Sequence, residues 1–272
     1  MDRYLYPALF AILIWWISTG AVLYVVNRAR STYAGSLWAA TGLLVLGTLG
    51  LYASAGEPGL VGVYAGFLAA LLVWAWHEMS FLMGFVTGPC TQAASYHYKG
   101  RAPLSEAIAT VIYHEFAIAI TAAVIVAITW GAENQAGTWT FLILWILRLS
   151  AKINVYLGVP NLTEDFLPEH LRYLKSYFCR RPMNMFFPIS VTATTIATVL
   201  TIAAAIDPGA SLRDAAAYTL LATLLALALV EHWFLVLPFD SARLWSWADQ
   251  GGDSAGKIEI AQNAQHATGG TS

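Results

Sequence analysis

Long apolar stretches separated by short polar breaks dominate the pattern of this chain. Seven stretches reach about the 20 residues that a helix needs to cross the hydrocarbon core of a membrane. They cover residues 5–26, 35–54, 60–87, 105–130, 138–158, 187–206 and 214–237. Glycine and proline, which end helices, mark several of the breaks, as at 56–59 and 207–209. The pattern predicts an all-α, polytopic membrane bundle with about seven transmembrane helices.

The composition agrees with a chain that is dissolved in lipid. Of the 272 residues, 58% are hydrophobic and 11% are charged, whereas soluble domains carry about 25% charged residues. The 11 tryptophans and 13 tyrosines suit the membrane interface, because their rings combine an apolar body with a polar edge. The net charge of -2 argues against a nucleic-acid partner. The first apolar stretch is followed by no small-residue cleavage site, so it is predicted to remain as a helix.

Lysine and arginine are distributed unevenly between the two sides of the predicted bundle. With the amino terminus outside, the outer segments carry Arg3 and Arg213. The inner segments carry Arg28, Arg30, Lys99, Arg101, Arg172, Lys175, Arg180, Arg181, Arg243 and Lys257. Because cytoplasmic loops carry the excess of these residues, the amino terminus is predicted outside and the carboxyl terminus in the cytoplasm. The two cysteines, Cys90 and Cys179, have neither disulfide-framework nor zinc-site spacing.

Residues 159–186 form the one sizeable polar segment between predicted helices. Thr163, Glu164 and Asp165 resemble a helix start, and apolar positions then recur at helical spacing: Phe166, Leu167, His170, Leu171, Leu174 and Phe178. We expect a short amphipathic helix along the inner membrane surface, with its basic residues towards lipid headgroups. Residues 1–240 are thus predicted to form the bundle. Residues 241–272 lack an apolar period and are predicted to be a mostly disordered cytoplasmic tail.

Ionisable side chains inside the predicted spans are the main candidates for function, since each costs roughly 2.5–3.5 kcal/mol to insert. They are His77, Glu78, His114, Glu115, Arg148, Lys152, Glu231 and His232. A rise of about 1.5 Å per residue places all of them in the cytoplasmic half of the bundle, roughly 8–15 Å below the surface. Four helices that deliver polar groups to one level predict a shared buried site.

Three interpretations of this site remain open. In the first, Glu78, Glu115 and Glu231 neutralise Arg148 and Lys152 and so hold the helices together. In the second, the histidines and glutamates bind iron, manganese or zinc. The candidate metal ligands are His77, Glu78, His114, Glu115, Glu231 and His232. Adjacent His and Glu residues point about 100° apart on a helix, however, and the Glu-x-x-His spacing of di-iron bundles is absent.

The third interpretation is contact with a pigment or another tetrapyrrole. His77, His114 or His232 would ligate a central magnesium or iron, and Trp76 would pack on the ring. A substrate or proton path is a further possibility for the same residues. The sequence has no Gly-rich phosphate loop, no GxSxG and no HExxH, and it has no pair of broken helices of the transporter type.

At these motifs the sequence resembles the PuhE family of photosynthetic complex assembly proteins from purple and related phototrophic bacteria. The residues that carry the resemblance are WWISTG (15–20), WAWHEMSFLMGFVTGP (74–89), the pair His114-Glu115, the long stretch 134–178, MNMFFPISVT (183–192) and EHWFLVLPFD (231–240). The resemblance implies a multi-pass protein of the bacterial inner membrane, which is either the cytoplasmic or the intracytoplasmic membrane. It also implies a role beside the reaction centre and its core antenna. No catalytic residue can be carried over from it.

The expected function is therefore a non-enzymatic assembly factor for the reaction centre–core antenna complex, which influences the supply of bacteriochlorophyll. Its expected partners are reaction-centre and core-antenna subunits, pigment-synthesis enzymes and membrane lipid, and its expected ligand is bacteriochlorophyll or a precursor. The alternative is a membrane metalloenzyme that acts on a pigment, quinone or carotenoid at the cytoplasmic leaflet.

Overall fold

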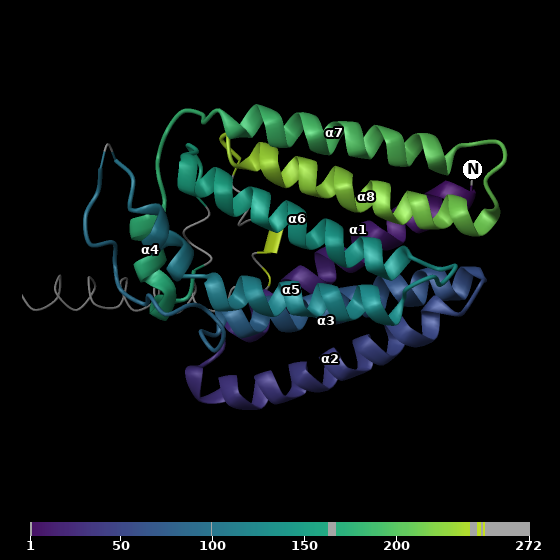
Figure 1. The fold of residues 1–272 in the computed structure, drawn as a ribbon, viewed down its shortest axis with the longest axis horizontal. Helices are drawn as coiled ribbons and strands as arrows, with labels where there is room; N and C mark the ends of the chain where they lie inside the picture. The colour runs from purple at the N-terminus through teal and green to yellow at the C-terminus, as the bar shows by residue number, and fades with distance from the viewer. Residues whose placement is uncertain (1, 99, 163–166, 240–243, 246, 248–272) are drawn as a thin grey trace, which may run out of the picture.

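The computed structural model describes residues 2–98, 100–162, 167–239, 244–245 and 247, and these ranges contain helices and loops but no β-strand (Figure 1). The α-helices are α1 (Asp2–Val26), α2 (Tyr33–Ala55), α3 (Leu60–Leu82), α4 (Leu104–Ala109), α5 (Ile112–Ile128), α6 (Ala136–Leu157), α7 (Phe186–Ala205) and α8 (Leu212–Phe234). The 3-10 helices are η1 (Arg30–Thr32) and η3 (Glu169–Tyr177). The predicted all-α class is confirmed.

Six helices of the described chain are long and apolar enough to cross a membrane: α1, α2 with η1, α3, α6, α7 and α8. The remaining predicted span, 105–130, is divided into α4 and α5, and α5 has only 17 residues. A helix of that length rises about 25 Å, less than the roughly 30 Å of a typical hydrocarbon core. The structure therefore shows a multi-pass membrane bundle, while the count of seven spans and the orientation stay predictions.

The break between α4 and α5 is stabilised by the loop that follows α3. The backbone N–H of His114 donates to the carbonyl of Thr87 at 3.0 Å, and the N–H of Cys90 donates to the carbonyl of Ala109 at 3.1 Å. Gly88 lies between these contacts, and a Cβ there would collide with the Ala109 carbonyl oxygen. Non-helical backbone at membrane depth is tolerated where protein groups satisfy it in this way.

The predicted third helix, 60–87, ends earlier than expected, at Leu82. Gly84 has a φ of +83°, in the left-handed region that glycine adopts without strain, and it turns the chain out of the helix. Residues 83–87 are apolar enough to extend a hydropathy window, so the sequence pattern did not show this stop.

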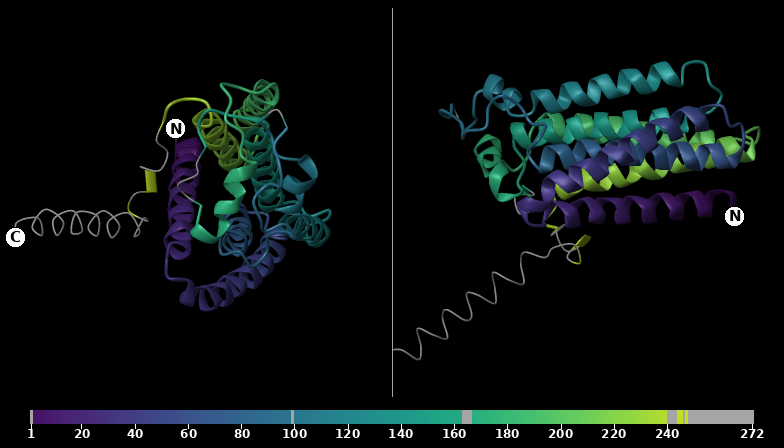
Figure 2. Two further views of the ribbon diagram at one scale, coloured as in Figure 1. Left: turned by 90° about the vertical axis from the view of Figure 1, so that its left-hand side faces the viewer. Right: turned by 90° about the horizontal axis from the view of Figure 1, so that it is seen from below.

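The helices lie side by side, with α2 packed along α3, α7 along α8, and α5 beside α6 (Figures 1 and 2). The centre is formed by α1, α3, α6 and α8, which all end on the same side of the bundle. We call this side the loop end; it carries the segments 83–98, 100–103, 158–162 and 167–185 (Figure 1, left). The amino terminus lies at the opposite end (Figures 1 and 2).

The central helices α3 and α6 cross at two glycines, and this crossing gives a testable prediction. A Cβ at Gly137 would collide with the Leu51 side chain and lie 2.7 Å from the Gly66 carbonyl oxygen. We expect Gly137→Ala to lower the free energy of unfolding by about 1–3 kcal/mol, because the helices must move apart. Thermal unfolding of the purified protein in detergent would measure this loss.

The control for that prediction is Gly42→Ala on α2. A Cβ at Gly42 meets no atom within 4 Å. Since alanine favours a helix over glycine by about 1 kcal/mol, this variant should melt at the wild-type temperature or above it. Equal melting temperatures for the two variants would contradict the close crossing.

The segment 167–178 covers the loop end of the bundle. Leu171, Leu174 and Tyr177 of η3 are 1%, 5% and 5% exposed and recur every three residues, as the 3-10 geometry requires. Leu171 and Leu174 pack in one cluster with Tyr33 of α2 and Met79 of α3. The apolar face of this segment packs on helix ends, which offer it a protein surface to bury. Its expected place along the inner membrane surface stays a prediction.

Two sequence predictions fall outside the described residues. The expected helix start at Thr163, Glu164 and Asp165, together with Phe166, is one of them. The other is the disordered tail, since of residues 241–272 only 244–245 and 247 are described. Both stay predictions.

His170 is expected to make the segment 167–178 sensitive to pH. Its ring is half-buried and lies 5.9 Å from the ring of Tyr33, centroid to centroid. Burial, and then the charge of Arg30, lower the pKa of His170 from 6.5. His170 binds a proton more readily when the segment is unfolded. The folded segment is therefore most stable above about pH 6.5 and loses stability as the pH falls.

We therefore expect the amide protection factors of residues 171–177 in hydrogen exchange to decrease as the pH is lowered from about 7.5 to about 5. In His170→Gln, which cannot titrate, this decrease should be absent. The same pH dependence in both proteins would assign it to another group.

Candidate functional site

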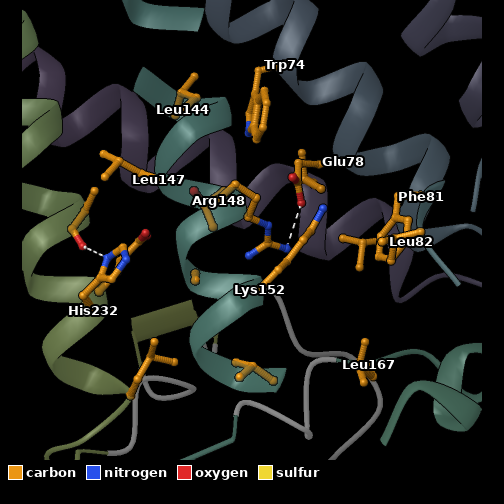
Figure 3. Close-up of a pocket in the computed structure, with 18 of the residues that line it drawn as sticks. Trp74, Glu78, Phe81, Leu82, Leu144, Leu147, Arg148, Lys152, Leu167 and His232 are labelled. Atoms are coloured by element: carbon orange, nitrogen blue, oxygen red, sulfur yellow. Dashed lines mark hydrogen bonds and ion pairs between the residues drawn. The ribbon is translucent and has the colours of Figure 1, made fainter. Parts of the chain in front are cut away.

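A cavity of about 450 Å³ lies between α1, α3, α6 and α8, in the half of the bundle next to the loop end (Figure 3). Its volume is within the range of small-molecule sites, about 300–1,000 Å³. Most of its wall is apolar, but Glu78, Arg148, Lys152, Glu231 and His232 also line it. We call it the charged cavity.

The first ion pair of the charged cavity joins α6 to α3. Arg148 Nη2 donates to Glu78 Oε2 at 3.1 Å (Figure 3). The Arg148 side chain is 44% exposed, whereas the Glu78 side chain is 14% exposed and its Oε1 has no hydrogen-bond partner in the described chain. A guanidinium has five N–H donors, and this hydrogen bond uses one of them. The rest of the Arg148 head remains open to the cavity.

The second ion pair is shorter and joins α6 to α5. Lys152 Nζ donates to Glu115 Oε1 at 2.6 Å, and Trp145 Nε1 donates to Glu115 Oε2 at 3.1 Å. The ammonium also lies 5.4 Å from the centre of the Phe81 ring, within the range of a cation–π contact. Lys152 therefore reaches the charged cavity with its charge already neutralised by Glu115, which lies behind it.

His232 of α8 uses both of its ring nitrogens. Nδ1 lies 2.8 Å from the carbonyl oxygen of Ala228, and Nε2 lies 2.9 Å from Ser150 Oγ. Because a carbonyl can only accept, Nδ1 carries the proton, and Nε2 of the neutral ring accepts from the Ser150 hydroxyl. The ring is thus fixed between α8 and α6.

His77 and His114 lie outside the wall of the charged cavity. They are 0% and 1% exposed, and their ring centroids are 6.3 Å apart. His77 Nε2 lies 3.1 Å from Thr121 Oγ1, whereas His77 Nδ1 and both nitrogens of His114 have no partner among the described residues. The Phe81 ring lies 4.6 Å from that of His114. Trp76 is also outside the wall, and its Nε1 donates to Thr41 Oγ1 on α2 at 3.0 Å.

The structure thus divides the candidate residues into two groups. Those at the charged cavity are Glu78, Glu231 and His232, with Arg148 and Lys152; those packed outside its wall are Trp76, His77, His114 and Glu115. Within the described ranges, no three His, Cys, Asp or Glu side chains are placed to hold a metal ion. The six predicted ligands, His77, Glu78, His114, Glu115, Glu231 and His232, are therefore not assembled into one metal site, and Glu78 and Glu115 instead neutralise cations.

Two contributors to the site were missed by sequence reasoning. Trp145 precedes Arg148 by three residues and Lys152 by seven, a spacing that puts all three on one face of α6 and could have revealed it. Trp245 lines the charged cavity and packs its ring 5.4 Å from that of Trp15. Because these two tryptophans are far apart in the chain, no local sequence pattern indicates that they are in contact.

The charged cavity does not fit a pigment held through histidine. Ligation of a central magnesium needs an imidazole nitrogen that is free and faces the ligand. His232 is the one histidine that lines the cavity in the described chain, and both of its nitrogens are engaged. The free nitrogens of His77 and His114 do not reach the cavity wall.

Comparison with known proteins gives two matches. Residues 1–255 match the family DUF3623, described as proteins of unknown function. A relative from Rhodobacter capsulatus, described as an uncharacterized 30.4 kDa protein in the puhA 5′ region, is 37% identical over 248 residues, which cover 88% of this chain and 89% of the relative. No solved structure matches the chain. Since the family match spans nearly the whole sequence, the chain belongs to the DUF3623 family.

Proposed function

We propose that this protein is a membrane-embedded assembly factor for the photosynthetic reaction centre–core antenna complex, of the PuhE type, in the bacterial inner membrane. The observation that carries the proposal is the relative that is 37% identical over 88% of this chain, because its description places it in the puhA 5′ region. That location suggests a photosynthesis gene cluster. The residues that resemble the PuhE family lie in the same matched region.

The pairing of the polar groups at the charged cavity fits a role in holding the helices together. Arg148 and Lys152 each have a carboxylate partner, and His232 has a partner at each nitrogen. Polar groups that are paired in this way hold helices together in membranes. No observation on the described residues favours the alternative of a metalloenzyme. We propose that the protein acts on the supply of bacteriochlorophyll through its partners, with reaction-centre subunits, core-antenna subunits and pigment-synthesis enzymes as candidates.

Co-purification tests this proposal. The full chain, tagged at its amino terminus, would be purified from phototrophically grown cells in mild detergent, with an unrelated tagged multi-pass protein as the control. We expect enrichment of reaction-centre or core-antenna subunits, and a lower absorbance of the assembled complex in a deletion strain. If neither those subunits nor pigment-synthesis enzymes are enriched, and the deletion leaves the absorbance unchanged, the proposal is wrong.

A further inference from the structure

The wall of the charged cavity requires a ligand with an apolar body. Side chains such as Leu71, Trp74, Leu144 and Leu224, from α3, α6 and α8, surround most of the space (Figure 3). These helices are long and apolar enough to span a membrane, and the cavity extends between them towards loop-end residues such as Leu167 and Leu174. A molecule that binds there must bury an apolar body against the side chains of the wall.

The charges around the cavity argue against an ionic ligand. Each cation already has its carboxylate, since Arg148 pairs with Glu78 and Lys152 with Glu115. Glu231 is a third acid, and it interacts electrostatically with Arg148. An anionic head would therefore meet one acid more than there are cations. A cationic head would be attracted by Glu231, but it would have to lie beside the Arg148 guanidinium, whose charge repels it. An uncompensated charge in a medium of low polarity is costly.

The cavity nevertheless offers hydrogen-bond donors that need acceptors. The Arg148 side chain is 44% exposed, faces the cavity and makes one hydrogen bond to a protein group in the described chain. A guanidinium has five N–H donors, so several of those of Arg148 are available to a ligand in the cavity. A carbonyl oxygen is a neutral group with two lone pairs and no hydrogen of its own to donate, so it can accept from two N–H donors at once.

We propose that the charged cavity binds a neutral, lipid-soluble molecule whose polar end is a ketone or ester carbonyl, with Arg148 as the donor to that oxygen. The apolar body of the ligand lies against α3, α6 and α8. This site goes beyond the assembly role and does not depend on it, because it follows from the geometry of the cavity alone.

Photolabelling with four matched probes tests the ligand class. The full-length protein, in lipid nanodiscs, is exposed to diazirine probes that share one alkyl chain and end in a methyl ester, a carboxylate, a primary amine or a methyl group. Labelled peptides are identified by mass spectrometry, with an excess of unlabelled methyl ester as competitor. The signal is the labelling of the cavity wall that the competitor removes. We expect this signal to be about tenfold higher for the ester probe than for the other three probes. A tenfold preference is the effect expected of one hydrogen bond to a charged donor.

Glu78→Gln provides a change of preference that a merely structural role would not produce. Without the Glu78 carboxylate, Arg148 loses its hydrogen-bonded acid while Glu231 and Glu115 still interact with it electrostatically, so we expect labelling by the carboxylate probe to rise towards that by the ester. Glu133→Gln is the matched control, because Glu133 pairs with Arg213 at the opposite end of the bundle, and it should leave the wild-type preference unchanged.

Ala151→Phe addresses the possibility that the labelling reports lipid contact outside the cavity. Ala151 lines the cavity, and a phenyl ring there should remove the competed labelling by all four probes. The proposal is overturned if no probe labels the wall, if the carboxylate or the amine labels wild type as well as the ester does, or if Glu78→Gln leaves the preference unchanged. Labelling that persists in Ala151→Phe overturns it as well. None of these results bears on the co-purification test, so failure of the site and failure of the assembly role can be distinguished.

Discussion

Replacing Lys152 with methionine is expected to lower the free energy of unfolding by about 3–5 kcal/mol, the cost of leaving one member of a buried ion pair uncompensated. The variant keeps most of the side-chain volume but removes the 2.6 Å hydrogen bond to Glu115 Oε1. Glu115 would then keep Trp145 as its one hydrogen-bond donor in the described chain. Thermal unfolding in detergent, followed by the reaction of the buried Cys179 thiol with a fluorogenic reagent, should show a fall of roughly 6–20 °C.

The double variant Glu115→Gln/Lys152→Met separates charge from packing. It removes both charges, so it should recover most of the lost stability, and the two substitutions should be far from additive. Arg172→Met is the control, because its ion pair with Glu169 is long, at 3.8 Å, and its side chain is 66% exposed. This control should melt like the wild type. A double variant no more stable than Lys152→Met would show that the pair is not the source of the effect.

The positions of most helices could be predicted because the width of the bilayer sets their length. The stretches 35–54 and 187–206 correspond to α2 (Tyr33–Ala55) and α7 (Phe186–Ala205) within two residues at either end. The stretch 105–130 shows the limit of this reasoning, because the sequence remains apolar through the break after α4. The contacts of His114 with Thr87 and of Ala109 with Cys90 join residues that are distant in the chain, and they distinguish two helices from one.

The depth of the ionisable groups in the bundle could be predicted from the sequence, but the division between those at the cavity and those packed outside it could not. Rise per residue placed them at one depth, but the rotation of each helix decides which group faces the cavity. Neighbouring residues point about 100° apart, so Glu78 reaches the cavity while His77 packs behind it. Three acids and two cations also allow several ion pairs, and the sequence alone does not show that Arg148 pairs with Glu78.

The segment after α6 shows how one pattern can fit two helix types. Leu167, His170, Leu171 and Leu174 recur at helical spacing, which led to the prediction of a short amphipathic helix. The structure has the 3-10 helix η3, in which Tyr177 continues the buried series from Leu171 and Leu174. Packing of these side chains on the end of the bundle, rather than the local sequence, determines that buried residues recur every three positions.

Asn184→Ala is expected to lower the free energy of unfolding by about 2–4 kcal/mol, since it removes the hydrogen bonds to the first residues of α7 and leaves buried partners unsatisfied. The Asn184 side chain joins the end of α6 to the start of α7. Its Nδ2 donates to the Gly158 carbonyl at 2.9 Å and to Asn154 Oδ1 at 3.1 Å. Its Oδ1 accepts from the N–H groups of Phe186 and Phe187, both at 2.9 Å. The thiol-reactivity melt should shift by roughly 4–16 °C.

Asn184→Asp distinguishes the two halves of this link. Aspartate can still accept from the start of α7, where a negative charge is favourable, but it cannot donate to the oxygens of α6. Because Gly158 O and Asn154 Oδ1 only accept, we expect this variant to remain destabilised, which would assign most of the loss to the tether on α6. Asn27→Ala, at an exposed position after α1, should melt like the wild type. If Asn184→Ala has the same melting temperature as this control, Asn184 does not stabilise the position of α6, the helix that carries Arg148 and Lys152.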